Sequence, residues 1–336
     1  MKYLMSNAKN KVVVHLLLLC FLCLMFHRPV SAQQISLSIT PPILELVIKP
    51  GKSVMIAYQV SNQGDPVILT AKLVSFEPRD NFGKIRLKDG IEGPIRFELD
   101  NSDIQLERPF FLKTGASQQL LLRIRAPEGA ANGDYYYTLL AETTPVDNID
   151  GTAGPKTKAS IGSNILVTVT DSGVIDIRPK VVLFEVINKL KMFNQKIKIF
   201  DSFDKIPLVL IVENKGKNLI KPEGKISLIG NFGERIDYPI IPKNILSESQ
   251  RLVEASSSAN PLEQRETSYS TVFSGFFIGQ YRVTTEINFG ESSPTLFAKT
   301  SFFAFPFKLA AVLFLTVGLI VFIVGRFFAP DSKEQQ

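Results

Sequence analysis

The sequence predicts an all-β protein with two tandem immunoglobulin-like β-sandwich domains, followed by one C-terminal transmembrane helix. Three observations support this fold class. Short runs rich in Val, Ile, Leu, Thr, Tyr and Phe recur between turns that contain Gly, Pro or Asn. No convincing long amphipathic helix interrupts these runs. A long uncharged apolar run, residues 309–325, stands near the C-terminus.

The first 32 residues have the pattern of a signal peptide. Lys2, Lys9 and Lys11 precede an apolar run at residues 12–26, and small residues then end at Ala32. A positive segment, an apolar segment and a small-residue cleavage site are the three parts of an export signal. We expect cleavage after Ala32. A retained signal anchor is the alternative, although the apolar run is short for a bilayer span.

Removal of this leader changes the composition of the chain. Both cysteines and both histidines lie within residues 1–32, so the mature chain has neither. Four of the 38 basic residues also leave and no acidic residue does, so the formal charge falls from +6 to 34 − 32 = +2. The high pI therefore belongs to the leader, and no nucleic-acid partner is expected.

Several kinds of chemistry need the residues that the mature chain lacks. Without His or Cys there is no Ser-His-Asp triad, no Cys nucleophile and no zinc held by His or Cys. No phosphate-binding glycine loop is present either. We therefore expect no enzyme, no catalytic residue, no cofactor and no metal. Glycan hydrolysis by two carboxylates stays formally open, because acidic residues are plentiful.

One acidic loop partly resembles a calcium-binding loop. Asp147, Asn148 and Asp150 precede Gly151, but the further oxygen ligand and the distal Glu of a full calcium loop are missing. A solvated turn is the main expectation at this position, and calcium binding is the alternative. A lysine-rich stretch at residues 215–225 has a similar pair of interpretations: a solvated hairpin, or a contact with an anionic wall polymer.

Two copies of a motif divide the exported part into two domains. Val-x-Asn-x-Gly occurs with Asn62 and again with Asn214, and each copy is followed later by a Gly-x-Tyr turn. We expect a first sandwich at residues 33–172 and a second at residues 174–301. Residues 144–163 and 247–268 are polar and are expected to be loops. Residues 185–193 fit either a strand or a short helix.

The tyrosines of the first Gly-x-Tyr turn have two interpretations. Tyr135 and Tyr281 stand where immunoglobulin-like domains place a tyrosine corner, a Tyr whose hydroxyl bonds to nearby backbone. Strand alternation puts Tyr135 and Tyr137 on one face and Tyr136 on the other. The main expectation is a core face and a sheet-surface face. The alternative is an aromatic binding surface, for which Tyr136 and Tyr137 are the candidate residues.

The C-terminal apolar run predicts a membrane anchor. We place the transmembrane helix at residues 305–325, because backbone groups in lipid must bond within their own segment. Residues 326–336 then form a short cytoplasmic tail that opens with Arg326. Together with the signal peptide, this predicts a single-pass cell-membrane protein with its N-terminal part outside.

Two stretches of the first domain resemble a known bacterial family. They are "SLSITPPILELVIKPGKSVMIAYQVSN", residues 36–62, and "GDYYYTLLAET" with "ASIGSNILVTVTDSG", residues 133–143 and 159–173. These resemble the DUF916 family, the peptidoglycan-binding domain of WxL-interacting proteins. The resemblance covers residues 36–173, whereas the second domain matches only in architecture. It implies a wall-facing, membrane-anchored protein whose first domain holds peptidoglycan and whose second holds a surface WxL protein.

These observations lead to three functional hypotheses. The first is a non-catalytic, membrane-anchored envelope binding or adhesion protein that holds peptidoglycan or another surface protein. The second is a chaperone-like assembly factor that lends a β-edge to a client strand. The third, with least support, is a carboxylate-dependent glycan hydrolase.

Overall fold

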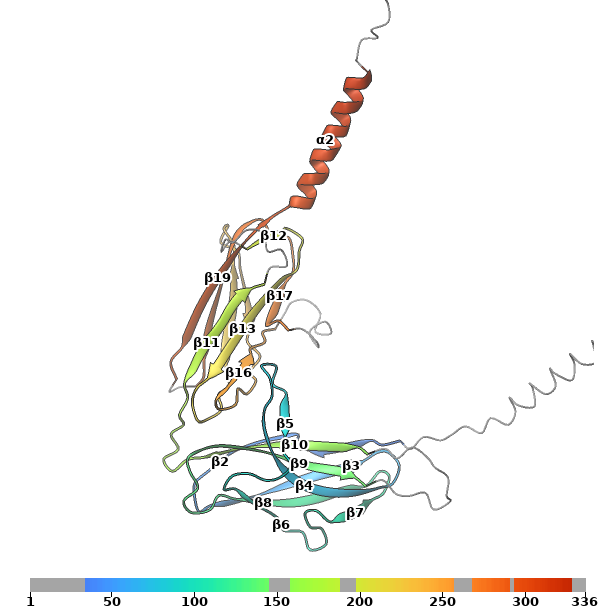
Figure 1. The fold of residues 1–336 in the computed structure, drawn as a ribbon, viewed down its shortest axis with the longest axis vertical. Helices are drawn as coiled ribbons and strands as arrows, with labels where there is room; N and C mark the ends of the chain where they lie inside the picture. The colour runs from blue at the N-terminus through green and yellow to red at the C-terminus, as the bar shows by residue number, and fades with distance from the viewer. Residues whose placement is uncertain (1–33, 145–157, 188–197, 257–267, 291–292, 328–336) are drawn as a thin grey trace, which may run out of the picture.

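The computed structural model describes residues 34–144, 158–187, 198–256, 268–290 and 293–327. Within these ranges the chain forms two β-sandwiches and one C-terminal helix, as the fold class predicts (Figure 1). The predicted signal peptide, the Asp147–Asp150 loop and residues 328–336 of the predicted tail lie outside the described residues.

The first sandwich consists of two sheets. One has the order β1-β3-β8-β6, and the other has the order β2-β10-β9-β4-β5, with β7 also paired to β4. The strands are β1 (Leu37–Thr40), β2 (Ile43–Ile48), β3 (Ser53–Asn62), β4 (Val67–Pro78), β5 (Ile85–Leu87), β6 (Arg96–Leu99), β7 (Pro109–Leu112), β8 (Ser117–Arg125), β9 (Gly133–Thr143) and β10 (Ser160–Val169).

The second sandwich repeats this plan. Its sheets have the orders β11-β13-β16, with β17 also on β13, and β12-β19-β18-β14-β15. The strands are β11 (Pro179–Val186), β12 (Ile199–Asp201), β13 (Ile206–Asn214), β14 (Glu223–Ile229), β15 (Arg235–Pro239), β16 (Ser249–Leu252), β17 (Thr271–Phe273), β18 (Gly279–Asn288) and β19 (Leu296–Phe305).

In both sandwiches the first two strands lie in different sheets. In the first, β1 pairs antiparallel with β3, and β2 then runs parallel to β10 in the other sheet. Pro41 and Pro42 separate β1 from β2, and proline has no backbone N–H with which to continue a ladder. In the second, β11 pairs with β13, and β12 runs parallel to β19. The shared order shows that the two halves have the same topology.

Each sandwich is filled by inward-facing side chains from both of its sheets. Tyr58, Leu122 and Tyr137 are fully buried in the first core. Ile206 and Phe273 are fully buried in the second. Burying one large apolar side chain contributes about 1.5–3 kcal/mol, so cores of this size stabilise the domains without disulfides.

The Val-x-Asn-x-Gly motif ends β3 in a turn that hydrogen-bonds to the segment before β1. Asn62 is fully buried; its Nδ2 donates to the carbonyl of Asp65 at 2.7 Å, and its Oδ1 accepts the Gly64 N–H at 3.0 Å. The Asp65 N–H then donates to the carbonyl of Gln34 at 2.8 Å. A Cβ on Gly64 would lie 2.2 Å from that same carbonyl oxygen, so only glycine fits.

The second copy of the motif has the same geometry at the end of β13. Asn214 is fully buried and its Oδ1 accepts the Gly216 N–H at 3.0 Å, while its Nδ2 donates to the carbonyl of Asn218 at 2.7 Å. The Asn218 N–H donates to the carbonyl of Asp176, and a Cβ on Gly216 would lie 2.2 Å from that oxygen. In both domains the motif therefore has a structural role, which is to hold the turn against the segment that precedes the first strand.

Parts of the segments expected to be loops are strands. Ser160–Ser163 begins β10 and pairs with β9, and Ser249–Leu252 forms β16 and pairs with β13. Their polar composition is typical of loops, but pairing with a neighbouring strand overrides local composition. The ambiguous segment is strand as far as Val186 in β11, and residues 188–193 lie outside the described residues.

The apolar C-terminal run is a helix, α2 (Phe307–Phe327), which leaves the far end of the second sandwich (Figure 1). By length and composition it could cross a membrane, and none of its residues is buried in the protein. The expected start at residue 305 was two residues early, because Phe305 still pairs with Asp201 in the sheet and Pro306 ends that ladder. Arg326 lies in the last helical turn and not in the tail.

We expect Gly64→Ala and Gly216→Ala to destabilise the protein by about 1–3 kcal/mol each, because the added methyl collides with an immobile backbone carbonyl. The measurement is the urea unfolding midpoint of the detergent-solubilised full chain. Gly90→Ala is the matched control, since nothing lies within 4 Å of the added Cβ. An unchanged midpoint in Gly64→Ala and Gly216→Ala would show that the turns are not fastened as described.

Candidate functional site at the junction of the sandwiches

One carboxylate at the start of β9 joins the two sandwiches. Asp134 Oδ1 accepts hydrogen bonds from Thr168 Oγ1 in its own domain and from Asn218 Nδ2 in the second domain, both at 2.8 Å. Its Oδ2 accepts the main-chain N–H of Leu219. Its own N–H donates to the carbonyl of Lys217 at 3.2 Å. The turn after the second Asn-x-Gly motif is thus held by the first domain.

Tyr136, two residues after Asp134 on the same face of β9, adds to the contact between the domains. Its hydroxyl accepts the Ser247 N–H at 2.8 Å and lies 2.9 Å from Ser247 Oγ and 3.1 Å from Asp134 Oδ2. Its ring stacks on Phe76, with centroids 5.6 Å apart. Burial, and then the Asp134 charge, raise the pKa of Tyr136, so the hydroxyl stays protonated. Around it lies a small apolar cluster from both domains: Phe76, Tyr136, Leu166, Ile85, Leu219 and Leu246.

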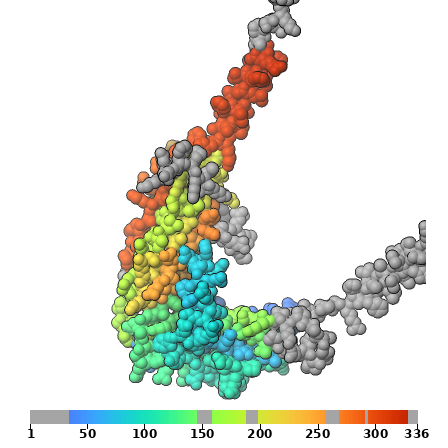
Figure 2. All heavy atoms as spheres, in the orientation of Figure 1, coloured from blue at the N-terminus to red at the C-terminus, as the bar shows by residue number. Residues whose placement is uncertain are grey.

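Two further contacts flank the Asp134–Tyr136 pair. Glu45 on β2 accepts from Lys221 Nζ at 3.1 Å and from Asn244 Nδ2 at 2.6 Å. Partial burial alone would raise the pKa of Glu45, but these two donors outweigh burial and lower it. The β4–β5 hairpin lies against the second sandwich (Figure 2), where the carbonyl of Asn81 accepts the Leu252 N–H at 2.6 Å.

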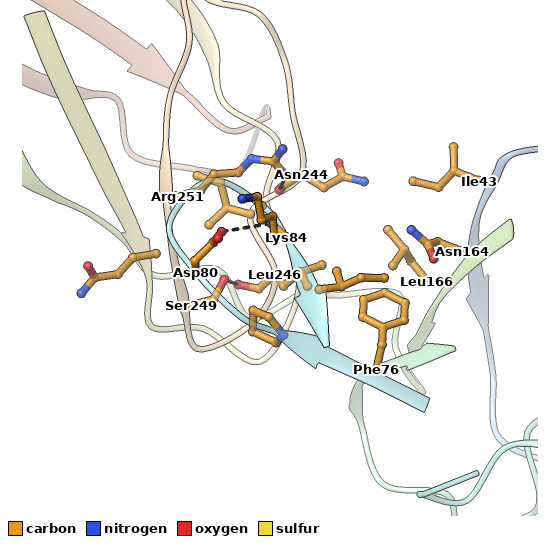
Figure 3. Close-up of a pocket in the computed structure, with 15 residues that line it drawn as sticks. Ile43, Phe76, Asp80, Lys84, Asn164, Leu166, Asn244, Leu246, Ser249 and Arg251 are labelled. Carbon is orange, nitrogen blue, oxygen red and sulfur yellow. Dashed lines mark hydrogen bonds between the residues drawn. The ribbon is translucent and has the colours of Figure 1, made fainter. Parts of the chain in front are cut away.

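Beside these contacts the junction contains a recess of about 90 Å³ (Figure 3). Ile43, Phe76 and Leu246 contribute apolar surface to it. Asn244 and Arg251 of the second domain contribute polar groups, and the Arg251 guanidinium lies against Gly83 of the hairpin. The recess is therefore built by both domains and depends on their relative placement.

Two polar atoms at this recess are buried without a hydrogen-bond partner among the described residues: Arg251 Nε and Asn244 Oδ1. Arg251 Nη1 donates to the carbonyl of Asn244 at 2.7 Å, and Asn244 Nδ2 is occupied by Glu45. Burial lowers the pKa of Arg251, while the charges of Glu254 and Asp80 act in the opposite direction. Both atoms are buried, so a ligand that carries an amide group could pair with them only where the recess opens around it.

The four tyrosines singled out in the sequence lie in three different environments. The Tyr135 hydroxyl donates to the carbonyl of Ala131 at 3.0 Å, and the Tyr281 hydroxyl accepts the Ile278 N–H at 3.4 Å. Tyr137 is fully buried and donates to the carbonyl of Glu92 at 2.8 Å.

Tyr136 is only 9% exposed, between the two domains, and Tyr137 is fully buried. Neither candidate binding residue therefore presents a ring to an external ligand in this arrangement.

The sequence alone does not mark the residues of the junction as functional. Asp134 lies between Gly133 and Tyr135 and reads as an ordinary turn residue. Arg251 falls inside a segment expected to be a loop. Within the described ranges no group of three or more acidic, His or Cys residues could hold a metal ion.

Comparisons with known proteins show likeness only at the level of solved structures. No family model matches the chain, and no curated protein does. The Escherichia coli chaperone DraB is 12% identical with a TM-score of 0.35, covering 80% of this chain and 100% of its own. A chain of the Salmonella enterica SafA pilin–SafB chaperone complex is 12% identical with a TM-score of 0.34, covering 80% and 99%. A Porphyromonas gingivalis protein of unknown function is 12% identical with a TM-score of 0.30, covering 78% and 98%. These TM-scores are all below 0.5, so the matches say nothing about what this chain does.

We expect Asp134→Ala to loosen the junction, because Asn218 Nδ2 and the Leu219 N–H lose their acceptor. Leaving buried donors unsatisfied costs about 1–3 kcal/mol. Hydrogen–deuterium exchange of the full chain should speed up at residues 217–219 and stay unchanged in the core strand β3.

Asp103→Ala is the control for this experiment, since Asp103 is exposed in the first domain. Equal exchange at residues 217–219 in the wild type and in Asp134→Ala would contradict the role given to Asp134.

Proposed function

We propose that the chain is a non-catalytic, membrane-tethered binding protein of the cell envelope that holds peptidoglycan or another surface protein. The observation that carries the proposal is the recess at the junction, where Arg251 Nε and Asn244 Oδ1 are both without partners among the described residues. Both atoms are buried beside the recess, and a ligand around which the recess opens would supply the partners that they lack.

Amide groups are common to both proposed ligands. Peptidoglycan carries them in its acetylated sugars and its peptide stems, and a protein carries them along its backbone. Small ligand sites combine apolar walls with a few placed polar groups, and the recess has both. We infer that one amide or a short peptide segment occupies it, because about 90 Å³ is too little for a folded ligand.

The recess is lined by a single acidic residue among the described residues, which favours binding over hydrolysis. Glycoside hydrolysis requires two carboxyl groups on either side of the scissile bond. Among the described residues that line the recess, Asp80 is the one acid, and its Oδ1 already accepts the main-chain N–H groups of Phe82 and Lys84. This supports a holding function for the site.

The anchor is α2, for which we propose a single membrane crossing with the sandwiches outside and the tail inside. Asp201 and Asp204 hold the start of this helix: Asp201 Oδ2 accepts the Lys308 N–H at 3.0 Å, and Asp204 Oδ1 accepts from Lys308 Nζ at 2.7 Å. The Lys308 N–H bond is the largest cause of the lowered pKa of Asp201. This contact is therefore complete at neutral pH and is lost only as the pH falls through that lowered pKa.

The test is retention of the detergent-solubilised full chain on purified cell wall. Arg251→Met removes the donor and the charge, and Arg251→Lys keeps the charge but removes Nε. We expect both variants to reduce retention at least about fivefold, because an amide partner left unpaired costs about 1–3 kcal/mol. Arg125→Met, an exposed arginine on β8, should bind as the wild type does.

Full retention by both Arg251 variants would remove the recess from the binding site. Absence of wild-type retention at every salt concentration would count against peptidoglycan and leave a surface protein as the ligand to test. Unfolding midpoints of each variant separate loss of binding from loss of structure.

A second function is favoured by one open strand edge. β10 has ten residues, but β2 covers only Asn164 to Val169 on its outer side. Ser160–Ser163 therefore has no strand on that side among the described residues. An open edge can accept a strand from another chain, as a chaperone-like assembly factor would require. Capture of strand-deficient client domains, lost in Ser160→Pro at this exposed edge and kept in Arg251→Met, would favour this function over the first.

A further inference from the structure

Large exposed apolar side chains gather where α2 leaves the second sandwich. We define the collar as six of them: Phe203, Phe232, Phe276, Ile278, Phe305 and Phe307. Their exposed fractions range from 41% at Phe305 to 84% at Phe232. Contiguous exposed apolar surface on a folded protein marks a site of contact with another protein or with a membrane.

Strand registers bring the collar to one end of the sandwich. Asp201 pairs with Phe305, so the turn that contains Phe203 follows directly beside the end of β19. Gly279 pairs with Ala304, so residues 276–278 lie at the same end. The Phe277 N–H also donates to the carbonyl of Ser202 at 2.9 Å.

The β14–β15 turn brings Phe232 to this end as well. Ile229, the last residue of β14, pairs with Arg282 near the start of β18. Asn231 in the turn lies 3.0 Å from the position of a Cβ on Gly279.

Ring contacts tie neighbouring parts of the collar together. The rings of Phe203 and Phe276 have centroids 5.0 Å apart, and those of Phe305 and Phe307 are 5.1 Å apart. One contact thus lies between two turns at this end of the sandwich, and the other joins the end of β19 to the first helical residue.

The length of α2 decides where the collar lies relative to a bilayer. Its 21 residues rise about 32 Å, and a hydrocarbon core is about 30 Å thick. Within the described residues the helix is just long enough to cross the hydrocarbon, and Pro306 alone separates it from β19. A span of this length places the first helical turn at the boundary of the hydrocarbon. The end of the second sandwich from which α2 leaves must therefore lie at the headgroup layer.

We propose that the collar lies in the lipid headgroup layer and seats the second sandwich on the membrane that α2 crosses. This inference rests on the proposed membrane crossing of α2. Apolar and aromatic side chains at a protein–membrane boundary bury their rings between headgroups and acyl chains. Lys308 has its ammonium group paired with Asp204, so a charge near the boundary is already compensated.

The chain has no tryptophan, so single introduced tryptophans report on one position each. The full chain is reconstituted in phosphatidylethanolamine–phosphatidylglycerol vesicles that contain brominated lipid. We expect bromine to quench Phe203→Trp and Phe232→Trp, with blue-shifted emission and loss of quenching by aqueous iodide. Phe111→Trp, an exposed position in the first sandwich, is the control and should respond to iodide only.

Phe314→Trp lies in the middle of α2 and tests the membrane crossing itself. It separates failure of the membrane contact of the collar from failure of the crossing. If bromine quenches Phe314→Trp while both collar tryptophans behave like Phe111→Trp, the crossing stands and the membrane seat is overturned. If bromine quenches none of these positions, the proposed crossing of α2 and the seat that rests on it are both overturned.

Discussion

The placement of the two sandwiches depends on the part-buried hydrogen bonds around Asp134. A carboxylate that accepts from both domains is costly to desolvate, and its stabilising effect depends on every donor being in place. The contact is therefore sensitive to geometry and favours one relative arrangement of the domains. Tyr136 adds apolar area to the same contact, and Glu45 adds a third point of attachment. The recess with Arg251 exists only in that arrangement, since both domains line it.

Much of the fold could be predicted from the sequence, because it is governed by local chemistry. Alternating β-runs, the Asn-x-Gly turns and the C-terminal apolar run each depend on residues close together in the chain. Asn62 and Asn214 could be recognised as a repeat before their fastening role was visible. The polar strands at Ser160 and Ser249 could not be recognised, because their partners lie far away in sequence and decide their conformation.

The junction was beyond sequence reasoning for the same reason. Tyr136 reads as an outward-facing strand residue, but Leu219, Leu246 and Ser247 of the second sandwich help to cover it. Arg251 reads as a charged loop residue, yet packing against Gly83 partly buries its guanidinium. A site assembled from two domains leaves no short motif, so its residues become visible only when the domains are placed.

The most direct test of this account is a distance distribution between spin labels across the junction. Once Cys20 and Cys23 are replaced by serine the chain has no other cysteine, so Glu98→Cys in the first sandwich and Ile236→Cys in the second give one labelled pair. The account predicts a single narrow distribution for the full chain in vesicles. A broad or multiple distribution would contradict it, because the recess would then have no fixed shape to offer a ligand.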